Sequence, residues 1–197
     1  MKDFNIVLFD DFEILDPFGP AEVIGNLPDI YRLRYFSLNG GHVKSSQLAV
    51  VDTLPFVDMN TDGILLIPGG FGVRALVKDE HYIMNIRSYA EKAPYVLTVC
   101  NGSALLAKTG LLDQKRATGY KAKFDWVCSN RQEVNWAKKA RWVKDEKFYT
   151  SSGISAGIDM ALGFVRDMHG IDAASMIATE MEYIWNDDME NDPFAAA

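Results

Sequence analysis

The sequence predicts a doubly wound α/β fold, in which a mostly parallel sheet is covered by helices on both faces. Short apolar runs rich in β-branched and aromatic residues alternate with segments of helical spacing, an order typical of βαβ units. Several runs are continuously apolar, as expected for strands buried on both faces. No Pro/Gly/Ser-rich linker and no shift in composition divides the 197 residues. We therefore predict one domain over residues 1–190 and a disordered tail over 191–197.

The first 70 residues contain three expected strands, one helix and one hairpin-like segment. FNIVLFD (4–10) is almost wholly apolar and predicts a buried strand, and PFGPAEVIGNL (17–27) predicts a helix opened by prolines. YRLRYFSL (31–38) alternates polar and apolar residues, which indicates a strand with one exposed face. Residues 42–56 carry the strand pieces of a hairpin or an edge addition, and DGILLIPGG (62–70) is a buried strand that runs into a glycine-rich turn.

The middle of the chain continues this alternation. Residues 79–93 have helical spacing, and YVLTV (95–99) is the next buried strand. The pattern then predicts a helix over 102–112, a short strand near 116–119 and a helix over 121–132.

The last third contains a hairpin followed by two helices. ARWVKDEKFYTSSG (140–153) has two strand-like halves around Lys-Asp-Glu-Lys, which we expect to form the turn. Helices are expected over 154–168 and 171–186. The acidic NDDMEND (186–192) is typical of a solvated terminus.

Composition excludes several classes of function. The net charge of −7 disfavours nucleic-acid binding, which needs clustered lysine and arginine. The first ten residues contain acids and no secretion signal, and no apolar run approaches the roughly 20 residues that span a bilayer. Two cysteines, Cys100 and Cys128, make a poor disulfide scaffold and suit a reducing cytoplasm. We expect no membrane partner and a cytoplasmic location.

Cys100 is the first candidate site residue. In doubly wound sheets ligands bind beyond the carboxyl ends of the strands, and Cys100 directly follows the strand expected over 95–99. A thiol at the start of the next helix would face backbone N–H groups and the positive end of the helix dipole, which lower its pKa and favour the thiolate. Local context leaves two interpretations open: a nucleophile on a tight turn, or a small buried cysteine that only packs.

Two other strand ends carry polar groups. Backbone N–H groups of Gly70, in IPGGFG, and of Asn101 could form a two-donor oxyanion pocket, although Gly-Gly also fits a plain tight turn. Asp16, in ILDPFGP, is a candidate acid, and a helix N-cap is its alternative role. An ionised carboxylate beside a thiolate is unfavourable, so we expect the pair to share one proton.

The remaining candidates are weaker. His42, His81 and His169 are scattered and fit no zinc spacing, so we assign them structural or solvated roles and predict no metal site. Cys128 is expected to pack on a helix face. Aromatic residues that could line an apolar pocket, or equally pack in the core, are Phe71, Tyr120, Phe124 and Trp126.

Four ordered motifs carry a family resemblance. ILDPFGPAEV, IPGGFGV, VCNGSALLAKTGLLDQKRAT and GISAGIDMAL resemble the ThiJ/PfpI superfamily over about residues 4–183. Within it they are similar to the isonitrile hydratases and to the amidotransferase-like domains of AraC-type regulators. The resemblance implies a flavodoxin-like three-layer sandwich, as in class I glutamine amidotransferases, with a reactive cysteine at Cys100, a catalytic acid at Asp16 and a homodimer. No cofactor is expected.

The resemblance implies a cysteine-dependent enzyme that converts an isonitrile to a formamide through a thioimidate on Cys100. Asn101 stands where the related peptidases have histidine and the hydratases threonine, and Tyr120 stands where a histidine is usual, so peptidase activity is not expected. Two alternatives stay open. One is glyoxalase-, deglycase- or amidase-like activity on another small electrophile, and the other is a non-catalytic redox-sensing or ligand-binding module.

Overall fold

A mixed sheet forms the centre of the molecule in the computed structural model, which describes residues 1–195. Its strands are β1 (Lys2–Val7), β2 (Tyr31–Ser37), β3 (Asn39–Lys44), β4 (Val50–Pro55), β5 (Ile64–Ile67), β6 (Val96–Thr98), β9 (Trp142–Asp145) and β10 (Phe148–Ser151). The spatial order is β3-β4-β2-β1-β5-β6-β10-β9. The six central strands are parallel, and β3 and β9 are antiparallel edges. This is the flavodoxin-like doubly wound sheet that the sequence predicts.

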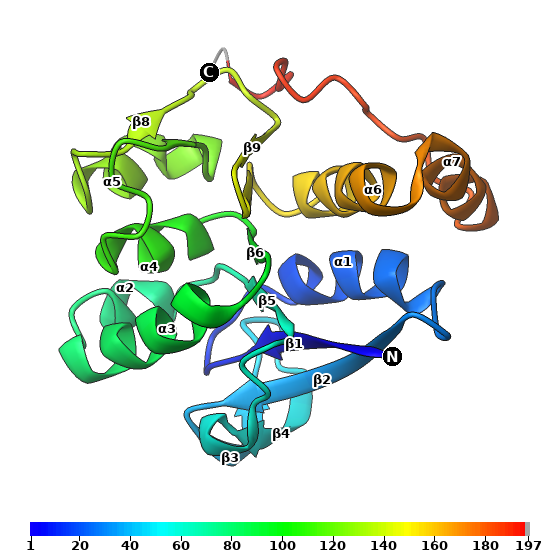
Figure 1. Ribbon diagram of the computed structural model, residues 1–197. Coiled ribbons are helices and arrows are strands. Elements are labelled where there is room, and N and C mark those ends of the chain that lie inside the picture. The colour runs from blue at the N-terminus through cyan, green and yellow to red at the C-terminus, as the bar shows by residue number, and fades with distance from the viewer. Residues whose placement is uncertain (196–197) are drawn as a thin grey trace.

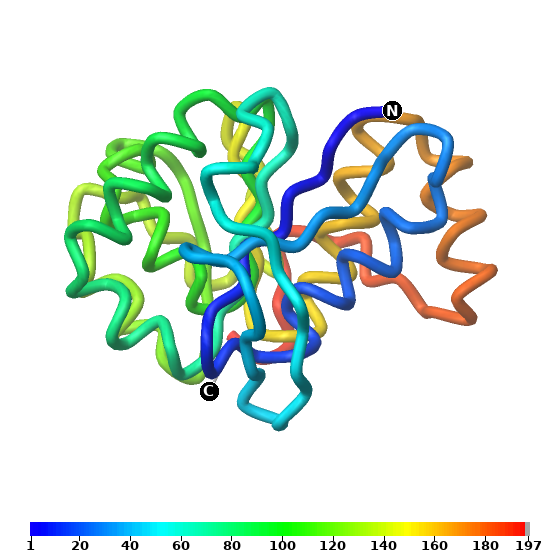
Figure 2. The backbone as a smooth tube through the Cα atoms, turned by 90° about the horizontal axis from the view of Figure 1, so that it is seen from below, coloured from blue at the N-terminus to red at the C-terminus, as the bar shows by residue number. Residues whose placement is uncertain are grey.

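Helices cover both faces of the sheet (Figure 1). They are α1 (Leu15–Gly25), α2 (Val73–Leu76), α3 (Glu80–Lys92), α4 (Gly102–Lys108), α5 (Phe124–Ser129), α6 (Ala156–His169) and α7 (Ile171–Glu180), with two 3₁₀ turns, η1 (Phe56–Asp58) and η2 (Lys121–Lys123). Figure 2 shows the green helices and the orange α6 and α7 on opposite sides of the central strands. A small parallel pair, β7 (Arg116–Ala117) and β8 (Asn135–Trp136), stands apart from the main sheet.

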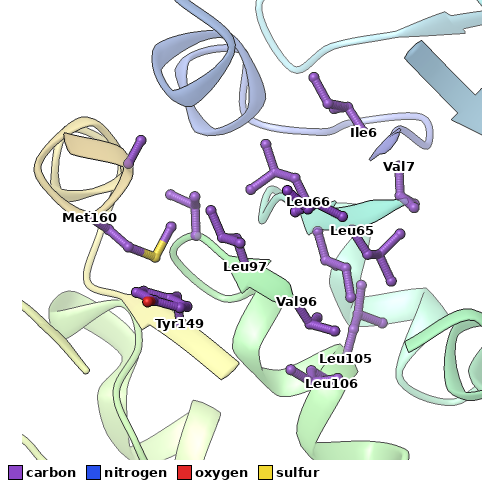
Figure 3. Close-up of a cluster of buried hydrophobic side chains, with 14 of the residues drawn as sticks. Ile6, Val7, Leu65, Leu66, Val96, Leu97, Leu105, Leu106, Tyr149 and Met160 are labelled. Atoms are coloured by element: carbon purple, nitrogen blue, oxygen red, sulfur yellow. The ribbon is translucent and has the colours of Figure 1, made fainter. Parts of the chain in front are cut away.

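The core is built around β5 and β6, two neighbouring inner strands of the sheet (Figure 3). Every residue of β5 and β6 is buried, which explains their continuously apolar sequences. Leu105 and Leu106 of α4 pack near one side of these strands, and Met160 of α6 lies on the other. The same packing fixes where β5 and β6 end, and so where the residues after them are placed.

Several boundaries differ from the prediction. β1 ends at Val7 rather than at residue 10, and α1 begins at Leu15, so Asp16 lies inside the first helical turn instead of before the helix. Pro17 is tolerated there because the N–H groups of a first turn need no intrahelical acceptor. The helix predicted over 171–186 ends at Glu180, and β8 was not predicted.

The segment after α7 is anchored by buried polar groups. Asp159 of α6 accepts hydrogen bonds from the Arg141 guanidinium (2.9 Å), the Tyr183 hydroxyl (3.0 Å) and the Asn186 N–H (3.1 Å). Asp192 is only 3% exposed and pairs with Arg141 at 3.6 Å. The prediction of a solvated terminus over 186–192 and of a disordered tail from 191 is therefore wrong at Asp192. The prediction for residues 196–197 lies outside the described residues.

We predict that Asp159→Ala lowers the free energy of unfolding by about 3 kcal/mol, because it leaves the buried Arg141 charge without its main partner. Asp187→Ala is the matched control, since Asp187 is exposed in the same region and makes no side-chain hydrogen bond within the described residues. Urea unfolding of both variants measures the difference. Equal stability of the two variants would contradict a structural role for Asp159.

Candidate active site

The candidate site lies where the parallel strands end. A cavity of about 170 Å³ is lined by residues that follow β1, β5, β6 and β10, among them Glu13, Phe71, Cys100 and Ile154. The strand order reverses between β1 and β5, and such switch points are where ligands bind in doubly wound sheets. The three strand ends singled out from the sequence do converge here.

Cys100 sits on a tight turn between β6 and α4. Its backbone is left-handed (φ 60°), an uncommon conformation for a residue with a side chain. The N–H of Cys100 donates to the Ser152 carbonyl at 3.0 Å, which fixes the turn against the end of β10. The N–H groups of Asn101 and Ile154 lie near enough to the sulfur to lower the pKa of the thiol. The backbone of Cys100 is thus held at the junction of β6 and β10.

Asp16 is buried beside this thiol. Its side chain is fully inaccessible (0% exposed), and Oδ2 accepts a hydrogen bond from the Gly69 N–H at 2.8 Å. Oδ1 has no hydrogen-bond partner within the described residues, and the Cys100 side chain lies near enough to lower the pKa of the carboxyl slightly. Burial raises the pKa of Asp16 to about 8, against the lowering effect of the Gly69 N–H. Asp16 is therefore a neutral acid at pH 7.

The protonation state of Cys100 is a correction to the sequence prediction. We expected a lowered pKa, but burial raises the pKa of the Cys100 thiol well above its usual range, and the negative charge that Asp16 would carry raises it further. The N–H groups of Asn101 and Ile154 lower it by less. Cys100 is only 5% exposed. The loss of hydration therefore raises the pKa of the thiol more than the nearby N–H groups at the helix start lower it. Burial therefore favours the protonated form of both groups.

The predicted oxyanion pocket is not formed as expected. The Gly70 N–H donates to the side-chain oxygen of Asn101 at 2.8 Å, and the Asn101 amide nitrogen donates back to the Gly70 carbonyl at 3.1 Å. The Gly70 donor is therefore occupied. Gly70 also has φ +128°, and a Cβ there would lie 2.4 Å from the Asp11 carbonyl oxygen, so glycine is required for the close approach of these loops. Ile154 replaces Gly70 as the second N–H near the sulfur.

The aromatic candidates divide between pocket and core. Phe71 (67% exposed), Tyr120 and Trp126 line the cavity. Phe124 instead packs edge-on against Trp136, with ring centroids 6.3 Å apart. Tyr120 lies against Gly153, where a Cβ would meet its ring at 2.4 Å. Burial raises the pKa of the Tyr120 hydroxyl, so this residue offers a neutral hydroxyl where relatives are expected to have an imidazole.

Sequence reasoning missed four lining residues. Glu13 follows β1, and its Oε1 accepts a hydrogen bond from Gln47 at 2.8 Å. Ile154 follows β10, and the strand-end rule applied to that hairpin would have found it. Arg74 and Lys123 also line the cavity, but they lie on segments with no sequence signal of a site.

The histidines and Cys128 lie outside the cavity. His169 is hydrogen-bonded to the Tyr31 hydroxyl at 2.8 Å, His42 is near Asp52, and His81 is beside Asn85. Cys128 is partly buried on α5, and burial raises its pKa to about 11. Within residues 1–195 no group of three His, Cys, Asp or Glu side chains could hold a metal ion. No helix in that range is both long and apolar enough for a bilayer.

Comparison with known proteins gives this site a family context. The DJ-1/PfpI family model matches residues 2–167. Isonitrile hydratase of Pseudomonas putida is 35% identical over 179 residues, which cover 91% of this chain and 77% of that enzyme. The HTH-type transcriptional regulator GbdR of Pseudomonas aeruginosa is 29% identical over 92% of this chain, which spans about half (51%) of the regulator.

Solved structures agree with the fold. A ThiJ/PfpI family protein from Pseudomonas syringae superposes with a TM-score of 0.84 at 24% identity, over 92% of this chain and 75% of that one. The four motifs, the sheet order and the family match lead to one assignment, which confirms the resemblance seen in the sequence. The chain belongs to the DJ-1/PfpI family.

Proposed function

We propose that the protein hydrates an isonitrile to an N-substituted formamide, with Cys100 as nucleophile and Asp16 as proton donor. The observation that carries the proposal is that Asp16 and Cys100 are both buried at the same strand ends, where burial raises the pKa of the Asp16 carboxyl to about 8 and so favours a proton donor beside the thiol. The 35% identity to isonitrile hydratase supports the same reaction class. The cavity beside Cys100, with its aromatic walls, fits a small substrate.

The first step adds the thiol across the terminal isonitrile carbon. That carbon is basic, and Asp16 gives it a proton while the sulfur bonds to the same carbon. The proton of the thiol passes to Asp16, so the carboxyl is neutral again and the product is the thioimidate R–N=CH–S–Cys100. No free thiolate has to accumulate, which suits a thiol whose pKa is raised.

The second step uses one water molecule. Water adds to the thioimidate carbon, and a proton reaches the nitrogen by way of the Asp16 carboxyl. The tetrahedral adduct R–NH–CH(OH)–S–Cys100 then collapses to R–NH–CHO. The departing sulfur regains its proton, and the N–H groups of Asn101 and Ile154 stabilise the charge that develops on it. No amine leaves, so no histidine is required to protonate one.

The site supports hydration better than the alternatives. Redox sensing by cysteine oxidation follows thiolate character, and the pKa of Cys100 is raised. The peptidase pattern in the family resemblance includes a histidine beside the cysteine, and no histidine lines this cavity. Activity on α-oxoaldehydes remains the competing enzymatic possibility, and it would give a hydroxy acid instead of a formamide.

We predict that Asp16→Asn lowers kcat for a neutral isonitrile at least about 100-fold, the scale of general acid catalysis, while Cys100 is still alkylated. Cys100→Ala should remove all turnover. Formamide release and intact-protein mass spectrometry measure the two effects. Hydration retained by Asp16→Asn would exclude Asp16 as the proton donor, and residual turnover by Cys100→Ala would exclude the covalent route.

We also predict a pH-dependent stability contribution from Asp16. Its pKa is raised in the folded chain to about 8 from 3.8, so both states hold the proton below pH 4, and only the folded state holds it between pH 4 and 8. The free energy of unfolding contributed by Asp16 therefore falls as pH rises through this window, by a few kcal/mol. Asp16→Asn should lose this slope in urea unfolding. If the free energies of unfolding of the wild type and of Asp16→Asn differ by the same amount throughout pH 4 to 8, Asp16 is ionised in the folded protein.

The homodimer implied by the resemblance stays a prediction. Exposed apolar side chains, including Leu48, Val50 and Val57, would be partly covered by association. Size-exclusion chromatography with light scattering should give twice the chain mass of 22.0 kDa. A mass of one chain would contradict the dimer.

A further inference from the structure

A second hollow adjoins the active-site cavity. It is lined by residues in and next to α2, α4 and α5, and these helices lie on the same side of the sheet (Figure 1). Arg74, Lys123 and Trp126 line both hollows. A ligand could therefore extend from Cys100 along the Trp126 side chain into this second space without leaving a continuous surface.

The second hollow is strongly cationic. Four of its lining residues are basic, namely Arg74, Lys78, Lys108 and Lys123, and no acidic residue lines it. The chain as a whole carries 27 acids against 20 lysines and arginines, so this concentration runs against the average charge. None of the four makes an ion pair within residues 1–195.

The acids nearest in sequence do not neutralise this cluster. Asp79 follows Lys78, but its carboxylate caps α3 by accepting the Tyr82 N–H at 3.0 Å. Asp125 precedes Trp126 and is exposed, and it does not line either hollow. Glu13 lines the active-site cavity, where its carboxylate is hydrogen-bonded by Gln47, but it does not line the second hollow.

We infer that this hollow, the cationic subsite, binds an anionic group of the substrate, a carboxylate or a phosphate, while the reactive end reaches Cys100. The inference rests on the proposed function for the identity of that reactive end. Uncompensated like charges around one concavity raise the local concentration of anions and their rate of capture. The Arg74 guanidinium can add paired hydrogen bonds to either anion. Trp126 supplies an apolar wall for the linker between the two ends.

The first test compares substrates that differ only in charge. An ω-isocyano carboxylate, an ω-isocyano phosphate ester and a neutral methyl ester of the same chain length are hydrated at low and at high salt. We expect kcat/KM for at least one anion to exceed that for the ester about tenfold at low salt, and the preference to shrink as salt screens the charges. Equal kcat/KM values for all three would overturn the subsite.

The second test removes charge locally. Lys78→Ala/Lys108→Ala should lower the anion-to-ester ratio of kcat/KM about fivefold, because neither lysine lines the active-site cavity and both line the subsite. Lys92→Ala/Lys138→Ala is the matched control. Each pair removes one lysine from the last turn of a helix and one from a surface turn. An equal fall in both double variants would mean that bulk charge alone sets the preference, and would overturn the subsite.

A third test does not depend on hydration. Cys100 is alkylated with iodoacetate and with iodoacetamide, and peptide mass spectrometry separates it from Cys128. Both reagents react with the thiolate, so the ratio of the two rates does not depend on the fraction of Cys100 that is ionised. A free thiol such as N-acetylcysteine gives the intrinsic ratio of the two reagents as the reference. We expect Cys100 to favour iodoacetate about threefold more than the reference, and the Lys78/Lys108 variant to lose part of that excess, because Arg74 and Lys123 remain. A ratio equal to the reference would overturn the subsite, whereas failure to hydrate the neutral ester would overturn only the hydratase.

Discussion

The contact between a buried carboxyl and a buried thiol is the constraint on which the rest of the site depends. Neither group can ionise cheaply at this depth, so the pair retains protons that exposed groups would have released. The surrounding backbone compensates both groups only in part. The Gly69 N–H is hydrogen-bonded to one oxygen of Asp16, and the N–H groups of Asn101 and Ile154 lower the pKa of Cys100. The loops after β1, β5, β6 and β10 must therefore meet within a few ångströms, which explains the close-packed glycines at the end of β5.

Asn101 illustrates how this meeting is secured. Its side chain both accepts from and donates to the Gly70 backbone, which joins the end of β5 to the start of α4 much as a strand pair would. An imidazole cannot present an adjacent donor and acceptor in this arrangement. The residue that distinguishes the chain from the peptidase pattern thus has a structural role next to Cys100. The same role removes the Gly70 N–H from the set of free donors.

The sheet, and the placement of Cys100 and Asp16 after strands that end at the same edge, were predictable. Each strand end can be read from its local sequence. Continuous apolar runs predict buried parallel strands, and the strand-end rule places polar residues after them. The raised pKa of Cys100 was not predictable. A helix end can be read from neighbouring residues, but the burial of the sulfur, which is the largest cause of the raised pKa, and the nearby charge of Asp16 arise only when segments distant in sequence are assembled. Arg74 and Lys123 were missed because only the assembled loops bring them to the cavity, whereas Ile154 follows β10 and the strand-end rule would have found it.

The left-handed backbone at Cys100 limits which nucleophiles the fold can carry. At φ 60° an unbranched Cβ is tolerated at some cost, whereas a β-branched side chain is a severe outlier. Serine can therefore occupy the turn with little rearrangement, and threonine cannot. The conservative substitution at this position is Cys100→Ser. It would place a hydroxyl, whose pKa is far higher than that of a thiol, in the same buried position. The geometry of this turn therefore admits cysteine or serine and excludes threonine.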